Sequence, residues 1–257
     1  MSALESVKRV SAPARARLRG VRELVRLIRT NVLGKFAARR GRPKLSTSCQ
    51  IGPLLSIYQE SGFLDRVGRF LEIGAFDGET FSNTSVLADL GWQGIYVEPI
   101  PQQAFRCRLR HSLNQVRVVN AAIAASRGEL ILEDMGALTS GKDAQVELYG
   151  RTEWAVGAFS QRQKRSVKAI LLDDLPDVTQ PFDLMVIDVE GMETVVWERM
   201  QRLKMYPQML IVELVDRHVD FAGHALADEH RELRRQILAA GYSDIFSDSI
   251  NSIFRRR

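Results

Sequence analysis

Polar side chains end four apolar stretches of the sequence, in positions from which they could act on one ligand. They are Glu72, Glu98, Asn120, and the pair Asp188 and Glu190. The apolar stretches predict strands, and the carboxyl ends of parallel strands lie along one edge of a sheet, where open α/β sheets bind ligands. A carboxylate at such an edge repels a pyrophosphate and attracts a cation, so the pattern favours a positively charged ligand.

The first of these strands runs directly into a turn rich in glycine, Glu72-Ile73-Gly74-Ala75-Phe76-Asp77-Gly78. Glycine lets the backbone come close to a ligand because it has no Cβ. A dinucleotide-binding turn reads G-x-G-x-x-G, whereas this one reads E-x-G-x-x-x-G, and no phosphate-binding lysine follows. The turn therefore favours S-adenosylmethionine, which carries a sulfonium and no phosphate, over NAD. An NAD-dependent oxidoreductase on a similar sheet is kept as an alternative.

Three of the strand ends have distinct expected roles toward S-adenosylmethionine. Glu72, Asp77 and the backbone of Gly74 are expected to face its amino-acid part. Glu98 is expected to bind both ribose hydroxyls, because a carboxylate has two acceptor oxygens. Asn120 is expected to meet the adenine amino group.

The fourth strand end is expected to carry the chemistry, with Asp188 and Glu190 beneath the methyl-transfer position. An acceptor oxygen would attack the sulfonium methyl in line, with positioning and a general base supplying the rate. The candidate bases are Asp188, Glu190 and His218, which follows the fifth strand. The two carboxylates could instead hold Mg²⁺, which takes oxygen ligands. Two carboxylates are too few to define a metal site, so the metal-free reaction is preferred.

Strand and helix patterns alternate along the body of the chain, which predicts a doubly wound, mostly parallel α/β sheet. The predicted strands are 69–74, 94–99, 116–119, 182–188 and 208–214, and the predicted helices are 46–61, 79–90, 101–112, 191–204 and 226–240. Residues 121–133 are expected to be extended or to form a hairpin, and 134–165 follow no regular pattern. Two final strands, 242–247 and 250–254, have no helix between them and predict an antiparallel edge.

Charge is distributed unevenly along the 257 residues. Residues 1–44 hold 13 Lys and Arg and two acidic residues, whereas the other residues hold 23 basic and 29 acidic ones. The prediction is a basic helical extension over 1–45 and a catalytic domain over 46–257. Two cysteines form no disulfide framework and the start of the chain has no signal-peptide pattern, so a reducing, cytoplasmic location is expected.

The basic extension has an apolar stripe at helical spacing, formed by Val21, Leu24, Val25, Ile28, Val32 and Phe36. One interpretation is a helix that packs on the body and exposes a basic face. The others are peripheral membrane contact and nucleic-acid binding. Nucleic acid is disfavoured because no aromatic residues alternate with the arginines.

Five stretches of the sequence resemble the FkbM-type methyltransferases, over roughly residues 68–247. They are Gly74-Ala75-Phe76-Asp77-Gly78, Ser82-Asn83-Thr84, Gly91-Trp92-Gln93-Gly94-Ile95-Tyr96-Val97-Glu98-Pro99, Leu172-Asp173-Asp174-Leu175, and Ile187-Asp188-Val189-Glu190-Gly191-Met192-Glu193. The last of these, together with L-D-D-L, is the most specific. Glu72 stands where the family often has Asp, which keeps the charge.

The resemblance implies a class I, Rossmann-like methyltransferase fold with S-adenosylmethionine as methyl donor. It also implies O-methylation of a sugar, a glycan or another small hydroxylated metabolite. The donor-binding residues expected on this basis are Glu72, Gly74, Ala75, Asp77, Gly78, Asn83, Glu98, Pro99, Asn120, Ala121 and Asp188. A non-catalytic, methyltransferase-like binding module is kept as an alternative.

Overall fold

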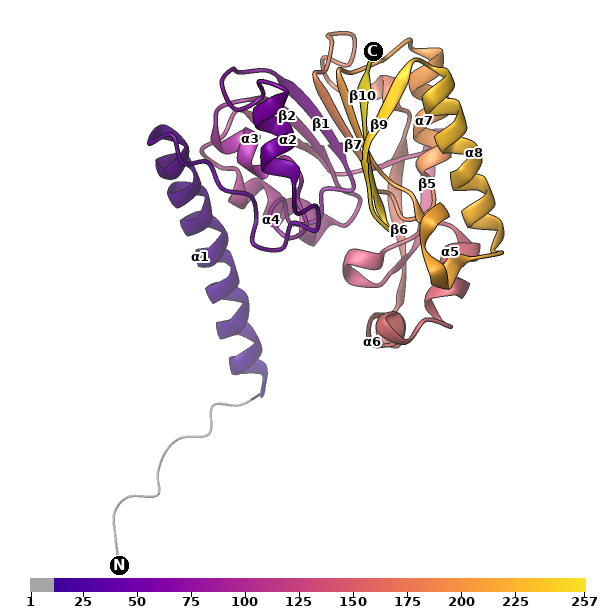
Figure 1. Ribbon diagram of the computed structural model, residues 1–257. Helices are drawn as coiled ribbons and strands as arrows, with labels where there is room; N and C mark the ends of the chain where they lie inside the picture. Colours follow the sequence, from indigo (N-terminus) through magenta and orange to yellow (C-terminus); the bar gives the residue numbers. More distant parts are fainter. Residues whose placement is uncertain (1–11) are drawn as a thin grey trace, which may run out of the picture.

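A seven-stranded sheet forms the centre of the computed structural model, which describes residues 12–257 and, from residue 20, all side chains except that of Trp154. Its strand order is β3-β2-β1-β7-β8-β10-β9 (Figure 1). The strands are β1 (Arg69–Ile73), β2 (Gln93–Val97), β3 (Val116–Val119), β7 (Leu184–Ile187), β8 (Met209–Glu213), β9 (Tyr242–Ser247) and β10 (Asn251–Arg256). The first five are mutually parallel, and β10 runs antiparallel to both its neighbours. The predicted sheet and its antiparallel end are confirmed.

Helices cover both faces of this sheet. On one side lie α2 (Leu54–Glu60), α3 (Ser85–Asp89) and α4 (Pro101–Arg110), and on the other α7 (Glu193–Arg202) and α8 (Ala225–Ala239) (Figure 1). Side chains alternate along each strand, so that Phe70 of β1 packs in the core under α2 and α3, while Leu71 and Ile73 pack in the core under α7 and α8. Strands buried on both faces explain the nearly unbroken apolar stretches in the sequence.

A second, three-stranded sheet has the order β4-β6-β5 and is made of β4 (Ala122–Ile123), β5 (Gly128–Asp134) and β6 (Gln163–Ile170). Residues 121–133 are extended, as one of the two alternatives predicted, but they form no hairpin, because β4 and β5 each pair with β6 rather than with each other. The segment before β6 contains short helices: η1 (Gly136–Leu138), α5 (Asp143–Tyr149), η2 (Glu153–Ala155) and α6 (Val156–Phe159). Further single turns are η3 (Leu172–Asp174), η4 (Val215–Arg217) and η5 (Val219–Phe221).

The helix predicted over 79–90 begins only at Ser85, and residues 76–84 form a loop. Asp77 is the reason, because its carboxylate accepts the backbone N–H groups of Glu79 and Thr80 at 2.9 and 2.6 Å. Phe81 follows with a φ of +61°, outside the helical region. Short polar side chains that bond the nearby backbone compete with helix formation in this way. The lead-in helix predicted over 46–61 is likewise shortened, to α2.

The N-terminal helix α1 (Ala12–Arg39) packs against α3 and α4. Asn31 is fully buried there, and its amide donates to Asp89 Oδ1 at 3.3 Å and to Asn114 Oδ1 at 3.0 Å. The helix therefore packs on the body, but not through its predicted apolar stripe, which is largely exposed. Within residues 12–257, no helix is both long enough and apolar enough to cross a bilayer.

Candidate active site

Two adjoining cavities lie at the carboxyl ends of the parallel strands. The first lies at the ends of β1, β2 and β7, where the strand order reverses between β1 and β7. The second is lined by the end of β8, by loops and by short helices. Asp188 and Glu190 line both cavities, as do Phe81 and Ala137. A strand-order reversal of this kind is the usual ligand site of an open α/β sheet.

Six of the residues predicted to bind the donor line the first cavity: Glu72, Gly74, Glu98, Pro99, Ala121 and Asp188. The three predicted bases, Asp188, Glu190 and His218, line the second cavity. The polar residues singled out at the strand ends therefore lie together around these two cavities.

Five other residues predicted to bind the donor are not part of the lining: Ala75, Asp77, Gly78, Asn83 and Asn120. Three of them, Asp77, Gly78 and Asn120, fix the surrounding backbone instead. Asp77 holds the loop described above, and Asn120 Nδ2 donates to the backbone oxygens of Glu98 and Pro99 at 2.8 and 2.9 Å. Gly78 has a φ of +73° and packs so closely on Cys107 and His111 that a Cβ would lie within 3 Å of both. Its glycine serves packing rather than ligand approach.

Position 74 requires glycine because the end of β1 lies very close to the backbone that follows β7. Its φ is +91°, and a Cβ there would lie 1.6 Å from the backbone oxygen of Asp188. Its N–H donates to Val97 O at 3.0 Å, so the end of β1 is fixed between β2 and β7. The contact sets the position of Asp188 relative to the first cavity.

Glu98 presents its carboxylate to the first cavity with both oxygens partly engaged. Oε2 accepts the N–H of Phe76 at 2.9 Å, and Oε1 accepts the N–H of Ile100 at 2.7 Å. Burial raises the pKa of Glu98 to about 8. Since a carboxylate oxygen can accept more than one hydrogen bond, each still has acceptor capacity for a ligand hydroxyl.

Glu72 lies deeper in the wall of the first cavity. Its Oε2 accepts the hydroxyl hydrogens of Ser82, at 3.3 Å, and of Thr84. Burial raises the pKa of Glu72 to about 7, although these hydrogen bonds oppose the shift. A cation placed in the cavity would favour the ionised form of this carboxyl.

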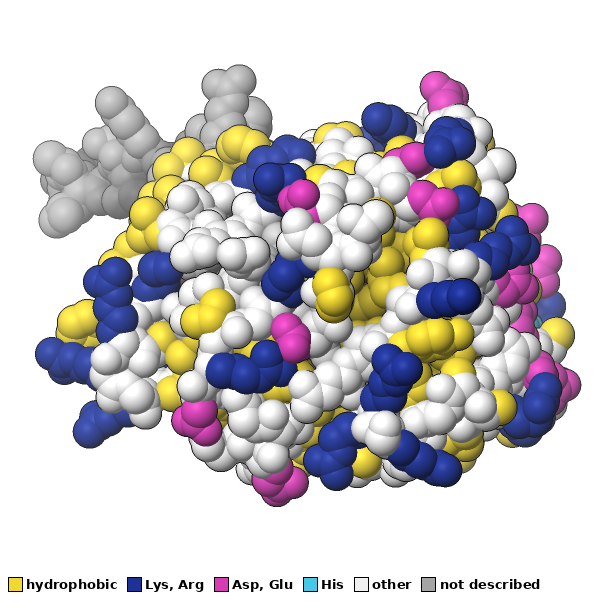
Figure 2. All heavy atoms as spheres, turned by 90° about the horizontal axis from the view of Figure 1, so that it is seen from above, with side chains coloured by type: hydrophobic (Ala, Val, Ile, Leu, Met, Phe, Trp, Pro, Cys, Tyr) yellow, Lys and Arg dark blue, Asp and Glu magenta, His cyan; other side chains and the backbone are white. Residues whose placement is uncertain are grey.

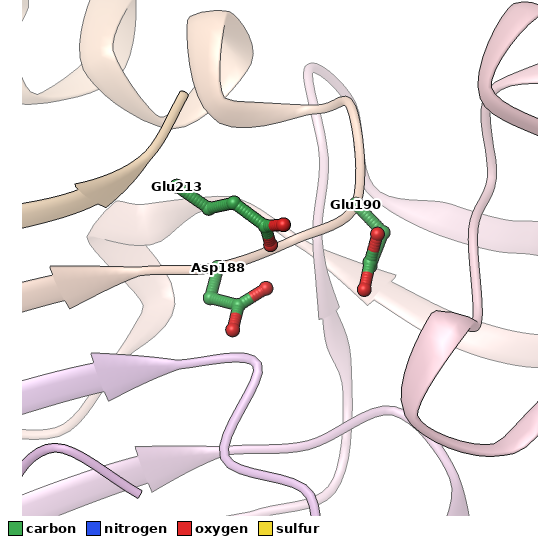
Figure 3. Close-up of side chains that lie close together, drawn as sticks. All are labelled: Asp188, Glu190 and Glu213. Atoms are coloured by element: carbon green, nitrogen blue, oxygen red, sulfur yellow. The ribbon is translucent and has the colours of Figure 1, made fainter. Parts of the chain in front are cut away.

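Asp188, Glu190 and Glu213 form a carboxylate cluster between the cavities (Figure 3), with one oxygen of each within 4.8 Å of the others. Burial raises the pKa of all three, and their mutual repulsion adds to the rise at Glu190 and Glu213. Asp188 and Glu213 also interact directly through their side chains, so the two carboxyls titrate as a pair. Sequence reasoning missed Glu213, which ends β8 and could have been found by the same strand-end rule.

Glu190 is held in a strained conformation, with a φ of +53°. Its backbone oxygen accepts the hydroxyl of Ser140 at 2.6 Å, and its carboxylate accepts the hydroxyl of Tyr149. Residues in sparsely populated backbone regions concentrate at functional sites, where the surrounding structure enforces them. Tyr149 was not predicted, because it lies in the segment 134–165, where no pattern was visible.

Glu193 supports the loop that carries Asp188 and Glu190. Its Oε1 accepts the N–H groups of Val189 and Gly191, each at 3.1 Å, and its Oε2 lies 3.1 Å from Nε2 of the buried His230. Glu193, the first residue of α7, thus fixes the loop that precedes the helix.

His218 lies at the wall of the second cavity, where its ring contacts Phe221 edge to face at 4.7 Å. Its Nδ1 accepts the N–H of Asp220 at 3.2 Å. This hydrogen bond occupies Nδ1 and leaves Nε2 for a ligand in the cavity. Of the three predicted bases, Asp188 and Glu190 line both cavities, whereas His218 lines only the second.

A family model described as the methyltransferase FkbM domain matches residues 72–243. The chain belongs to the FkbM methyltransferase family. The match contains the strands from β2 to β8 in full. It also includes the last two residues of β1 and the first two of β9, and it ends before β10. The resemblance seen in the sequence is thereby confirmed. No curated protein sequence matches the chain significantly.

Solved structures with a similar layout include three methyltransferases. An O-methyltransferase from Bacillus cereus in complex with SAH is 15% identical, with 90% of each chain covered and a TM-score of 0.48. TomG, an O-methyltransferase from Streptomyces achromogenes involved in tomaymycin synthesis and solved with SAM, is 14% identical, with 88% of this chain and 89% of that one covered and a TM-score of 0.46. The SAH-bound methyltransferase PaMTH1 from Podospora anserina is 11% identical, with 89% and 88% covered and a TM-score of 0.47.

Proposed function

We propose that this protein is an O-methyltransferase that uses S-adenosylmethionine in the first cavity and a small hydroxylated acceptor in the second. The observation that carries the proposal is that Asp188 and Glu190 line both cavities. A carboxylate at that junction can meet both the cationic donor and the acceptor hydroxyl. Membership of the FkbM family supports methyl transfer as the reaction. We assign catalysis to residues 46–257 and treat residues 1–45 as an extension.

The first cavity fits S-adenosylmethionine by its donor and acceptor groups. Glu98 offers one free acceptor position on each oxygen to the two ribose hydroxyls, while the backbone groups of Phe76 and Ile100 fix its orientation. Glu72 and Asp188 place negative charge near the amino-acid and sulfonium positions, which lowers the energy of a cation there. The bound donor supplies the methyl group and a good leaving group in its sulfur.

Asp188 is the proposed general base. Its carboxylate would accept the proton of the acceptor hydroxyl while the new oxygen–carbon bond forms and the carbon–sulfur bond breaks. Asp188 suits this role because it lines both cavities, whereas its neighbour Glu213 lines only the second. Glu190, fixed by Tyr149, would then orient the acceptor through a hydrogen bond.

The walls of the second cavity indicate the kind of acceptor. Apolar side chains such as Phe81, Leu138 and Phe221 line the cavity together with the carboxylate cluster. A sugar ring or another small polyol has both features that this lining requires, C–H faces for the apolar walls and hydroxyl donors for the carboxylates. We therefore propose a sugar, free or within a glycan, or a similar hydroxylated metabolite as the substrate.

The substitution Asp188→Asn tests the proposed chemistry. It should lower transfer of a labelled methyl group to a panel of sugars and small hydroxylated metabolites by about 10²–10³-fold. The matched control is Asp183→Asn, at the amino end of β7, where Asp183 accepts the N–H of Arg69 at 2.8 Å. Transfer by the control should stay within about twofold of wild type. An Asp188→Asn protein that keeps its rate would contradict the base assignment. A folded wild type that binds neither S-adenosylmethionine nor S-adenosylhomocysteine would favour the non-catalytic binding module.

A further inference from the structure

Helix α1 turns its apolar side away from the rest of the molecule. Five side chains are each 43–58% exposed, and at about 100° of rotation per residue they form one continuous stripe. They are Val21, Val25, Ile28, Val32 and Phe36, here named the α1 stripe. Single exposed apolar side chains are ordinary on protein surfaces, but a row of five along one helix marks an interaction surface.

The exposure of the α1 stripe is enforced by the opposite side of the helix. Asn31 makes three hydrogen bonds with the body, to Asp89, to Asn114 and from the N–H of Leu113. Gly34 lies so close to the body that a Cβ would be 1.9 Å from Asp89 Oδ2. Rotating the helix to bury the stripe would break all three hydrogen bonds and force larger residues into the place of Gly34.

Cationic side chains border the α1 stripe. Arg22, Arg29, Arg39 and Arg40 are exposed, and the guanidinium of Arg40 lies 4.1 Å from the ring centre of Phe36. The only acidic residue of α1 is Glu23, which pairs with Arg26 at 2.6 Å. Figure 2 shows yellow and dark blue side chains side by side along the left edge of the molecule, where α1 lies.

We propose that α1 lies in the plane of an anionic lipid bilayer, with the α1 stripe in the boundary between headgroups and acyl chains and the arginines on lipid phosphates. An apolar face bordered by Arg and Lys, with no unpaired acid, is the pattern that binds such surfaces. At 28 residues the helix is about 42 Å long, enough for several turns of contact. The inference is independent of the proposed methyl transfer.

Other occupants fit this surface less well. A second copy of α1 would bring two sets of arginines together without an acidic partner, which is unfavourable. A nucleic acid would pair with the arginines but would leave the valines and Ile28 of the stripe in water. The bilayer is the occupant that satisfies both the charge and the apolar side chains.

Vesicle sedimentation with the full chain tests the proposal. The protein should sediment with vesicles of phosphatidylcholine and phosphatidylserine at about 7:3, and much less with phosphatidylcholine alone. The double substitution Val25→Asp with Val32→Asp should weaken binding at least tenfold. The matched control is Val67→Asp with Val156→Asp, two exposed valines far from α1 in sequence, 62% and 53% exposed, and it should bind as wild type does. Equal thermal midpoints for the two variants would show that both remain folded.

A separate variant tests how much the arginines contribute to vesicle binding. Replacing Arg22, Arg29 and Arg40 together with Gln should weaken binding to the anionic vesicles at least tenfold and flatten its dependence on salt. Wild-type protein that stays in solution with anionic vesicles would overturn the proposal, as would equal losses in the two valine pairs. A dimer in sedimentation velocity that Val25→Asp with Val32→Asp dissolves would assign the surface to a second copy. Nucleic-acid binding that the Gln variant loses and the Asp variant keeps would assign it to nucleic acid.

Discussion

The two cavities of the site are built from different parts of the fold. The first is formed by strand ends, and its carboxylates are held by fixed neighbours: Glu98 by two backbone N–H groups, Glu72 by two hydroxyls. The second is formed largely by loops and short helices from six separate segments, which supply Gln50, Leu138, Tyr149, Phe221 and other side chains. A regular framework thus fixes the proposed donor site, while irregular segments set the shape of the proposed acceptor site.

Among the substitutions that distinguish the functions of the two cavities, Glu98→Gln is expected to have the largest effect. The amide would turn a donor toward one of the two N–H groups that Glu98 accepts, and would lose an acceptor for a ribose hydroxyl. Affinity for S-adenosylhomocysteine should fall about 10–100-fold by calorimetry. Glu60→Gln, an exposed change on α2, should leave it unchanged. Equal affinities in the two variants would mean that Glu98 does not hold the donor.

Tyr149→Phe should affect methyl transfer rather than donor binding, because Tyr149 lines only the second cavity. Removing the hydroxyl leaves the carboxylate of Glu190 without its strongest donor, and its pKa should rise further because that hydrogen bond lowers it. We expect methyl transfer to slow about tenfold and its pH profile to move to higher pH, with donor affinity unchanged. Tyr242→Phe is the control, since its hydroxyl donates to Pro207 O at 2.8 Å, away from both cavities. A matching loss of donor affinity would show that the cavities are not separable.

The free energy of unfolding should depend on pH because of the two buried carboxyl groups of the first cavity, Glu72 and Glu98. The pKa values of Glu72 and Glu98 are raised to about 7 and about 8 by burial, so both hold protons in the folded chain at a pH where the unfolded chain has released them. The free energy of unfolding therefore falls as pH rises from about 5 to about 8. We expect the thermal midpoint of the unliganded protein to drop by roughly 5 °C over this range. The Glu98→Gln variant should show a flatter dependence, and a midpoint that rises with pH would contradict the assignment.

The smallest effect is expected from removing metal ions from the carboxylate cluster between the cavities. Its oxygens suit Mg²⁺, and Glu213 adds a third carboxylate to the two foreseen in the sequence. Because we propose that Asp188 takes the proton directly, treatment with EDTA should leave methyl transfer unchanged. Loss of transfer on chelation, restored by Mg²⁺ and abolished by Glu213→Gln, would assign the cluster to a cation instead.

Sequence reasoning reached the first cavity because strand periodicity and strand-end acids are local signals. It placed β1, β2, β3, β7 and β8 within one or two residues at each end. It failed at the loop 76–84, where Asp77 bonds the backbone that a helix would need. In the second cavity it missed Tyr149 and Glu213, which meet the predicted bases only through tertiary packing. For α1 the spacing revealed an apolar stripe, but the buried Asn31 and the close approach of Gly34 decided which side faces the body.

A crystal structure with S-adenosylhomocysteine bound tests the central claim most directly. We predict the ligand in the first cavity, with its two ribose hydroxyls within hydrogen-bonding distance of the two oxygens of Glu98 and its sulfur directed toward Asp188. The ligand in the second cavity, or in the first cavity with its ribose away from Glu98, would contradict the account.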